Sequence, residues 1–420
     1  MFSALTHLQW SIMKQSPLIA EQKSHTFSFD WQLGLAFFAF IVIGANDGAV
    51  GVMIPSISAH YGVNKAIVSL LLLCCSAGYL IAAFNSGFLV KKLGERRFLL
   101  FGVSTVIVGA FSISMVPPFA FLTVPFFLVG LGIAALDTGL NAYIADQPRS
   151  ATPLNYLHAC YGAGALFGPI VASTIILVVG LTWNYVYDVW VILSFLFFFG
   201  VLLKFKKQGT GSESPPEVET QEKRSSMGNV LRLPVAWIAA FFLFFYVGVE
   251  ISLGTWIYSF LTEQRQQPTL FSAWIVSGYW MGLTLGRVFL AKLVNWLSER
   301  TAIQICVIGV MLGTFLTWLI PIGIVSAIGL CLTGFCLGPI FPTTIALMPQ
   351  LVPKRLLATA IGLVACMGGL GGTLFPWLSG NLAQVLGLWI ILPYAIALTM
   401  MMFLLWMPLQ LQQGSKQHAL

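Results

Sequence analysis

The chain has 420 residues, of which 58% are hydrophobic and only 8% are charged. With a mean hydropathy of +0.89, this composition excludes a soluble globular protein, which needs a more polar surface. The net charge of +7 alone would suit nucleic-acid binding, but the basic residues lie between apolar segments and indicate the loops of a membrane protein.

Apolar runs of at least about 18 residues recur along almost the whole chain, and each is long enough to cross the hydrocarbon layer as a helix. The short segments of alternating polarity that mark a transmembrane β-barrel do not occur. We therefore predict an all-α integral membrane protein with twelve transmembrane helices. The predicted spans are residues 31–58, 65–90, 98–117, 120–146, 154–181, 185–204, 234–261, 270–293, 302–320, 323–348, 357–382 and 387–408.

The longest polar tract between spans divides the chain in two. Residues 206–229, KKQGTGSESPPEVETQEKRSSMGN, are rich in Ser, Glu, Pro and Lys, a composition typical of a flexible linker. The predicted regions are an N-terminal tail at 1–30, a six-helix domain at 31–205, the linker at 206–233, a second six-helix domain at 234–408 and a C-terminal tail at 409–420.

The positions of the basic residues predict the orientation in the membrane. An even number of spans puts both termini on one side, and of the 21 Lys and Arg residues only Lys65 and Arg265 fall on the other side. The positive-inside rule therefore predicts that both tails are cytoplasmic. Residues 1–30 lack the apolar pattern of a cleavable signal peptide. We expect a multi-pass plasma membrane protein, with a bacterial inner membrane as its location.

Short motifs of the first half recur in the same order in the second half. The recurring pairs are Asp47 and Gly51 with Glu250 and Gly254, Gly78-Tyr79 with Gly278-Tyr279, and Gly162, Gly164 and Pro169 with Gly369, Gly371 and Pro376. The separation of the paired positions stays between 200 and 207 residues. A duplicated six-helix unit explains this regularity, and two such parallel repeats are expected to hold a substrate between them near the midplane.

Of the 14 acidic residues, only Asp47, Asp137 and Glu250 lie well inside predicted spans. An ionised carboxylate at the bilayer centre costs at least about 2.5 kcal/mol, so such residues usually face a partner or a solvated path. Because burial disfavours the charged form, we hypothesise that Asp47 and Asp137 are proton-coupling residues. The alternative for each is a permanently protonated carboxyl bonded to a backbone carbonyl. Substrate binding, coupling and helix packing all stay open for Glu250.

Neutral polar side chains on the same predicted helices would bind a hydroxyl-bearing solute. They are Asn46, Asn141, Asn155, His158 and Tyr161, of which His158 has a structural role as its alternative. Rings of the seventh and eighth spans, such as Trp256 and Trp280, would offer a stacking face, or else pack against helices and lipid. Arg287 is expected near the cytoplasmic end of its span, as a gate or interface residue rather than a substrate ligand.

The segment GFLVKKLGERR at residues 87–97 resembles the loop signature of the major facilitator superfamily, with two glycines, a leucine and then basic residues. The matching positions are Gly87, Gly94, Arg96 and Arg97. Lys91 stands where that family has an aspartate, so Asp146 is the expected partner of the arginines instead. Ordinary positive-inside charge is the alternative explanation of this loop.

Four further segments resemble the fucose, galactose and glucose proton symporter family within that superfamily. They are ANDGAVGVMIP at 45–55, GIAALDTGLNAYIA at 132–145, LNYLHACYGAGALFGP at 154–169 and YVGVEISLGTWI at 246–257. The resemblance implies twelve helices in two pseudo-symmetric halves. It also implies that the acidic residues at two of these motif positions, Asp47 and Asp137, carry proton coupling.

We therefore expect a secondary transporter that works by alternating access and takes up a sugar or similar polyhydroxylated solute with protons, with sodium left open as the coupling ion. The main alternative is a proton-coupled exporter of amphipathic molecules, and a transporter-like receptor without flux is a further one. Enzyme motifs such as HExxH and GxSxG do not occur, and neither a metal nor a cofactor is expected. The expected partners are a small-molecule substrate, protons and the lipid bilayer, with no nucleic acid, and the expected state is a monomer.

Overall fold

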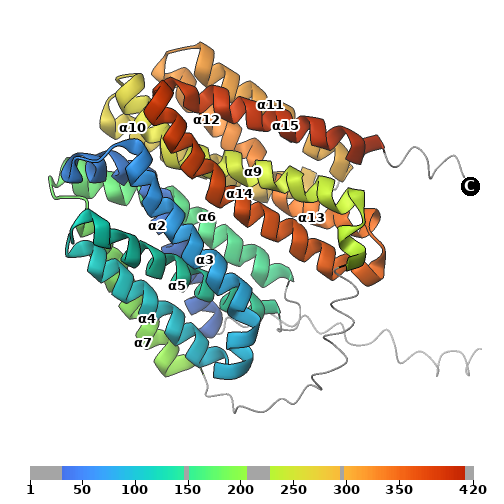
Figure 1. The fold of residues 1–420 in the computed structure, drawn as a ribbon, viewed down its shortest axis with the longest axis horizontal. Helices are drawn as coiled ribbons and strands as arrows, with labels where there is room; N and C mark the ends of the chain where they lie inside the picture. Colours follow the sequence, from blue (N-terminus) through green and yellow to red (C-terminus); the bar gives the residue numbers. More distant parts are fainter. Residues whose placement is uncertain (1–30, 146–150, 206–227, 294–297, 412–420) are drawn as a thin grey trace, which may run out of the picture.

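A computed structural model describes residues 31–145, 151–205, 228–293 and 298–411 of the chain. The regular elements in this part of the chain are helices (Figure 1). Eleven helical segments among the described residues are long and apolar enough to cross a membrane. The predicted eighth span, which carries Arg287, is also a helix but is not among those eleven. The predicted all-α fold is therefore confirmed.

The first half contains six long helices, close to their predicted bounds. They are α2 (Trp31–Tyr61), α3 (Lys65–Leu93), α4 (Glu95–Ser114), α5 (Phe119–Ala145), α6 (Ala151–Ser173), which continues as the π-helical turn η1 (Thr174–Val178), and α7 (Tyr185–Lys204). Two residues show why these helices begin and end where they do. The side chain of Asn64 caps α3 by accepting from the N–H of Ile67, and Gly94, with φ of +76°, allows the sharp link between α3 and α4.

The second half repeats this arrangement with one additional break. Its elements are α9 (Pro234–Ser259) with the π-helical turn η2 (Phe260–Gln264), α10 (Thr269–Leu293), α11 (Glu299–Leu319), α12 (Gly323–Leu337), α13 (Ile340–Leu351), η3 (Lys354–Leu356), α14 (Leu357–Leu386), η4 (Leu388–Ile390) and α15 (Ile391–Leu411). The single span predicted at 323–348 is therefore two helices. Pro339 explains the break, because proline lacks the N–H that a continuous helix needs.

Close contacts between helices repeat from one half to the other. Gly130 on α5 lies against the carbonyl oxygen of Cys75 on α3, and Gly334 on α12 lies in the same way against the carbonyl oxygen of Tyr279 on α10. Neither glycine has room for a methyl group. Glycines at such crossings let the backbones of membrane helices approach closely. The second helices of the two halves are thus related by a shift of 204 residues, from Cys75 to Tyr279.

The shift of 204 residues corrects one of the repeat pairs predicted from the sequence, Gly78 with Gly278. Gly78 packs on the carbonyl oxygen of Phe127 in α5, and the glycine that packs on the matching carbonyl of α12, at Cys331, is Gly282. The pairing of Gly78 with Gly278 was therefore wrong by about one helical turn. The sequence pattern Gly-Tyr recurs one turn before the position that makes the equivalent contact.

The two halves lie side by side, with the blue-to-green helices on one side of Figure 1 and the yellow-to-red helices on the other. They meet where α6 packs on α10, where α3 packs on α14, and where α2 crosses α9. At this last crossing Gly51 lies against the backbone of Gly254 and Thr255. Because Gly51 and Gly254 are repeat-related, their contact puts the pseudo-two-fold axis of the molecule between them.

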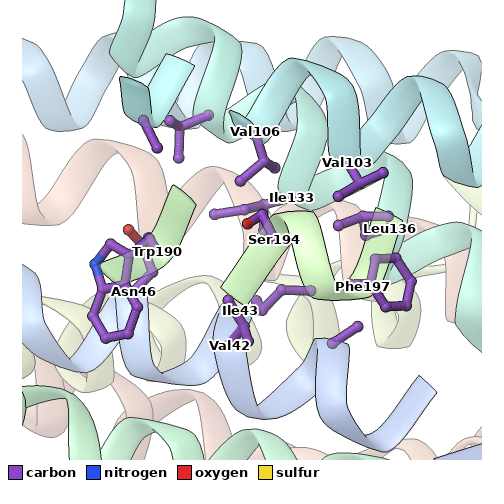
Figure 2. A pocket seen from close by; sticks show the side chains of 13 residues that line it. Val42, Ile43, Asn46, Val103, Val106, Ile133, Leu136, Trp190, Ser194 and Phe197 are labelled. Atoms are coloured by element: carbon purple, nitrogen blue, oxygen red, sulfur yellow. The ribbon is translucent and has the colours of Figure 1, made fainter. Parts of the chain in front are cut away.

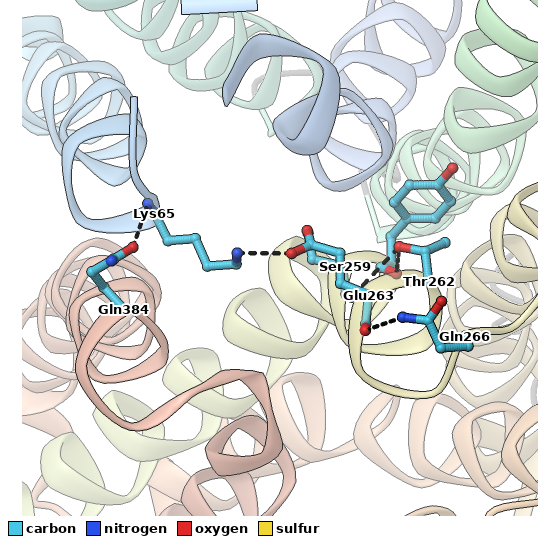
Figure 3. Close-up of polar contacts among 7 residues, drawn as sticks. Lys65, Ser259, Thr262, Glu263, Gln266 and Gln384 are labelled. Atoms are coloured by element: carbon cyan, nitrogen blue, oxygen red, sulfur yellow. Dashed lines mark hydrogen bonds and ion pairs between the residues drawn. The ribbon is translucent and has the colours of Figure 1, made fainter. Parts of the chain in front are cut away.

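One end of the bundle is closed by polar contacts between the halves. At the start of α3, the Nζ atom of Lys65 pairs with Oε2 of Glu263 in η2 at 2.7 Å (Figure 3). The backbone N–H of Lys65 donates to Oε1 of Gln384 in α14 at 3.0 Å. One turn further along α3, Ser69 lies against Gly380 of α14. Helices from both halves are thus held together at the end that carries Lys65.

Candidate functional site

The carboxylate of Asp47 lies on α2, one turn before the crossing of Gly51 with α9, and its observed hydrogen bonds come from neutral donors. The hydroxyl of Tyr161 on α6 donates to Oδ2 at 3.0 Å, and Nδ2 of Asn46 donates to Oδ1 at 3.2 Å. Asn46 is itself buried. A neutral phenol and amide stabilise a carboxylate less than a cation does, so they leave its protonated form accessible.

Small residues on α2 explain how Tyr161 reaches Asp47. Gly44 lies against the carbonyl oxygen of Tyr161, and Gly48 lies against the carbonyl oxygen of Ala165. A methyl group at Gly44 would lie 2.0 Å from the Tyr161 oxygen, so any larger residue would push the two helices apart. The stretch GANDGAVG thus combines a carboxylate with the close helix contact that brings its partner into hydrogen-bonding range.

Asp137 on α5 has the same kind of surroundings. The hydroxyl of Tyr79 on α3 donates to Oδ2 at 2.5 Å, and Nδ2 of Asn141 donates to Oδ1 at 2.8 Å. Asn141 therefore lies on the same helix face as Asp137, as their spacing of four residues predicts. The first half thus holds two carboxyl groups, each bonded to a tyrosine and an asparagine.

The third buried carboxylate, Glu250, has a cationic partner. On α9, Glu250 is 6% exposed, and its Oε1 accepts from Nη2 of Arg287 on α10 at 3.2 Å. The hydroxyl of Tyr279 donates to the backbone carbonyl of Glu250 at 2.9 Å. Arg287 lies six residues before the end of α10, and its guanidinium group reaches the carboxylate that lies one turn before the central crossing of α2 and α9. Its place near the cytoplasmic end and its role as a gate or interface residue stay predictions.

The break between α12 and α13 supports this ion pair. Gly338, at the end of α12, lies against the carbonyl oxygen of Leu283 and the backbone nitrogen of Arg287. A side chain at position 338 would collide with α10 where Arg287 leaves it. The Gly338-Pro339 turn thus lets α12 pack closely on α10 beside the ion pair.

The other predicted substrate-binding residues divide into two groups. His158 is exposed on α6 and makes an edge contact with the ring of Phe40, and Asn155 is on the same helix, but its side chain lies outside what the structure describes. Trp256 is fully buried, and its Nε1 donates to the carbonyl of Pro376 at 2.9 Å. Trp280 is 2% exposed and packs on Gly254. In this conformation both indole rings pack between helices and offer no accessible stacking face.

The loop residues lie at the far end of α3, and only part of their predicted contacts can be described. Nη2 of Arg96 donates to the carbonyl of Leu202, near the end of α7, at 2.7 Å. Arg97 and Gly87 are exposed. Asp146, the expected partner of the arginines, lies outside the described residues. Arg96 thus binds a helix C-terminus, where the helix dipole favours a positive charge.

A partly open cavity lies inside the first half, next to the site (Figure 2). Its lining comes from α2, α4, α5 and α7 and is apolar apart from Asn46, Ser194 and the indole of Trp190. Asn46 therefore borders this cavity on one side and the carboxylate of Asp47 on the other. The sequence gives no signal for this cavity, because its walls are ordinary valine, isoleucine and alanine residues of separate helices.

Three contacts of the site were missed in the sequence. Tyr79 was noted only as part of a repeat, although it bonds Asp137. The pairing of Glu250 with Arg287, 37 residues apart, and the contact of Lys65 with Glu263 were also missed. Arg287, the isolated cation of the predicted eighth span, was the available signal for the pairing with Glu250, since a charge in a membrane helix usually has a partner.

Two pseudo-symmetric halves with carboxyl groups near their crossing define the class of secondary transporters. The comparisons with known proteins agree. The model of the Major Facilitator Superfamily matches residues 36–376 and 271–418, and the chain belongs to this superfamily. The chain is thus a transporter and not an enzyme.

Its relatives include proteins named for sugars. The chain is 23% identical to the glucose/mannose transporter of Bacillus subtilis (strain 168), covering 83% of this chain and 86% of that protein. It is 23% identical to a glucose/galactose transporter of Brucella abortus, covering 90% and 93%. It is 26% identical to bypass of stop codon protein 6 of Saccharomyces cerevisiae, covering 83% and 76%.

Solved structures share the fold at low sequence identity. A nucleoside transporter, NupG, superimposes with a TM-score of 0.75 at 13% identity, covering 90% of this chain and all of that chain (100%). A D-xylose-proton symporter superimposes with a TM-score of 0.69 at 14% identity, covering 88% and 96%. These likenesses establish the twelve-helix fold of the superfamily for this chain.

Proposed function

We propose that the chain takes up a sugar or a similar polyhydroxylated solute together with protons by alternating access. The observation that carries this proposal is the pair of carboxyl groups, Asp47 and Asp137, each bonded to neutral donors only in the contacts seen here. A carboxyl group in such surroundings is suited to bind and release a proton. The relatives named for glucose, mannose and galactose support a sugar as the substrate class.

In this proposal the asparagines and tyrosines have two tasks. Asn46, Asn141 and Tyr161 hold the carboxyl groups and offer hydrogen bonds to substrate hydroxyls, while His158 and Asn155 of α6 are further candidates for substrate binding. Protonation of Asp47 or Asp137 removes a charge from between the halves and so changes the relative free energies of their two orientations. Substrate binding would then stabilise the orientation of the halves that is favoured when the carboxyl group is protonated.

We further propose that the tails are cytoplasmic and that the protein works as a monomer in a plasma membrane. The end that carries Lys65 then faces outward, because Lys65 and Arg265 are the basic residues on that side. In this orientation the conformation described above is closed to the outside by the contacts of Lys65 with Glu263 and Gln384.

Transport in liposomes tests the proposal. With purified full-length protein, an inward proton gradient should drive accumulation of glucose, galactose or mannose, and a sodium gradient should not. The variant Asp47→Asn should lose gradient-driven accumulation by at least about tenfold while still exchanging labelled for unlabelled sugar, because the amide still accepts from Tyr161 but cannot titrate. Unchanged proton-driven accumulation in Asp47→Asn would exclude the coupling role.

A proton-coupled exporter of amphipathic molecules is the second candidate. The apolar cavity of the first half favours it, since Val103, Val106 and Ile133 beside the amide of Asn46 suit a molecule with one polar group (Figure 2). Thermal-shift measurements with sugars and with hydrophobic cations separate the two candidates. Stabilisation by the cations alone would favour export.

A further inference from the structure

The ion pair of the second half has donors beyond the contact between its two members. The guanidinium of Arg287 has five N–H donors, and its hydrogen bond to Glu250 uses one of them at 3.2 Å. The buried side chain of Tyr246, one turn before Glu250 on α9, lies beside the pair. The two side chains also differ in exposure, with 23% of the Arg287 side chain accessible against 8% of Glu250. A charged group in a membrane helix that is partnered but still partly accessible is a candidate for contact with a ligand.

The ion pair lies beside a contact with the first half of the molecule. One turn before Arg287, Thr284 packs on Gly162, where α10 touches α6. The neighbouring residue of α6, Tyr161, donates its hydroxyl to the carboxylate of Asp47. The contact between α6 and α10 thus links the helix that binds Asp47 to the helix that carries Arg287.

The chemistry of the pair fits a neutral diol. Each hydroxyl of a vicinal diol donates one hydrogen bond and accepts others, so a carboxylate acceptor beside a guanidinium donor satisfies both functions at once. Because Glu250 and Arg287 neutralise each other, the pair offers no net counter-charge to a charged ligand. A charged derivative would lose the hydration of its charge without gaining an ion pair of its own, and this uncompensated desolvation disfavours it.

We propose that Glu250 and Arg287 bind the substrate together, and that their mutual neutralisation makes the transporter select a neutral polyhydroxylated solute over its acidic and amino derivatives. This inference rests on the proposed function and assigns Arg287 to substrate recognition rather than to gating. Removal of either charge should therefore reverse the selectivity in a direction set by the charge that remains.

The experiment measures binding of glucose, glucuronate and glucosamine, together with the matching galactose series, to purified full-length protein by titration calorimetry. The wild type should prefer the neutral sugar over both derivatives by about tenfold or more. Glu250→Gln leaves Arg287 unbalanced, so the affinity for the uronate relative to the neutral sugar should rise by about tenfold. Arg287→Gln leaves Glu250 unbalanced and should raise the relative affinity for the amino sugar by a similar factor.

Two further variants complete the design. Glu299→Gln, the same substitution at the start of α11 in the same half, should leave all ratios unchanged. The double variant Glu250→Gln/Arg287→Gln has no unbalanced buried charge, so it remains informative if a single variant fails to fold. It should bind the neutral sugar at least about tenfold more weakly than the wild type, because both charge-assisted hydrogen bonds are lost.

The outcomes separate this inference from the proposed function. If the wild type binds a neutral sugar and the single variants keep its ratios, or if the double variant keeps its affinity, the inference is overturned and the proposed function stands. If no neutral sugar binds to the wild type, the proposed function is overturned, and this inference with it.

Discussion

The two halves of the molecule hold buried carboxylates at related positions but give them different partners. Asp47 in the first half bonds a tyrosine and an asparagine, whereas Glu250 in the second half, 203 residues later, bonds Arg287. The flanking glycines are equivalent, since Gly51 and Gly254 touch at the central crossing. The helix packing is thus repeated in the two halves, whereas the partners of the two carboxylates differ.

This difference underlies the different tasks that we propose for the two halves. A carboxylate with neutral partners can lose its charge without leaving a cation unpaired, whereas loss of the charge of Glu250 would leave the guanidinium of Arg287 without a counter-charge. The first half is accordingly suited to proton coupling and the second half to substrate recognition. Substitutions at equivalent positions of the two halves test this division.

The largest expected effect comes from breaking the ion pair. Glu250→Gln leaves Arg287 without its counter-charge, which costs about 3–5 kcal/mol for a fully buried pair. Because 23% of the Arg287 side chain is exposed, we expect a loss of about 2 kcal/mol. Asp47→Asn should lose less than about 1 kcal/mol, because the amide oxygen still accepts from Tyr161.

Denaturant or thermal unfolding in detergent measures this difference. The double variant Glu250→Gln/Arg287→Gln serves as the control and should recover most of the lost stability, because it leaves no unbalanced charge. Equal losses in Glu250→Gln and Asp47→Asn would show that the two carboxylates have equivalent surroundings after all.

The second effect distinguishes two tyrosines. The hydroxyl of Tyr79 bonds the carboxylate of Asp137, whereas that of Tyr279 bonds a backbone carbonyl. A hydrogen bond to the charged form of a carboxyl group favours that form, so its loss makes protonation easier. Tyr79→Phe should therefore shift the pH profile of uptake to higher pH by about one unit, the equivalent of about 1.4 kcal/mol.

Tyr279→Phe is the matched control and should leave the midpoint of the pH profile in place, because its hydroxyl bonds a group that does not titrate. Initial rates of labelled-sugar uptake between pH 5 and pH 8 give both midpoints. A shift to lower pH in Tyr79→Phe would contradict the expected direction.

The third effect concerns the two contacts between the halves that are related by the repeat. A methyl group at Gly162 would lie 2.3 Å from Oγ1 of Thr284, whereas one at Gly369 would lie 3.6 Å from the side chain of Leu80. Gly162→Ala should thus cost about 1 kcal/mol through overpacking. Gly369→Ala should be neutral or slightly stabilising, since alanine is the better helix former.

Melting temperatures of the two variants in the same detergent measure this asymmetry. Similar changes of the melting temperature in both variants would contradict the expected difference between the α6–α10 and α3–α14 contacts. In the proposed alternating-access cycle, Gly162→Ala should also lower the uptake rate more than Gly369→Ala, because both contacts lie between the halves.

The smallest effect is expected at the closed end. Lys65 and Glu263 are 26% and 40% exposed, and such pairs contribute less than about 1 kcal/mol. Lys65→Gln should therefore shift the population toward opening at this end by no more than about fivefold, and less so at high salt. Distances between spin labels on α3 and α14 report the shift, and Lys92→Gln at the other end of α3 is the control.

A large part of the fold was predictable because membrane burial imposes a strong and local constraint. Every backbone polar group in the hydrocarbon layer must bond within its own helix, so apolar runs of about 20 residues identify the spans. The same constraint identified Asp47, Asp137 and Glu250 as exceptional, since a carboxylate in such a run needs an explanation. The break at Gly338-Pro339 was missed, because the apolar run continues through it.

Partners were harder to predict than positions. Asn141 was assigned to the face of Asp137 because both lie on one helix, where spacing decides which side chains meet. Tyr79, Tyr161 and Arg287 reach their carboxylates from other helices, and no periodicity in one helix determines the rotation of another. Trp256 and Trp280 looked available for stacking for the same reason, although both are packed between helices.

The sequence by itself determined that this protein spans a membrane, that its helices form two related halves, and which buried carboxylates are exceptional, because these properties follow from the local cost of placing polar groups in lipid. The tertiary structure alone decided which partner each carboxylate has and which end of the bundle is closed. Those properties depend on close helix crossings at residues such as Gly44, Gly51 and Gly338. At these glycines the absence of a side chain sets the distance and rotation of one helix against another.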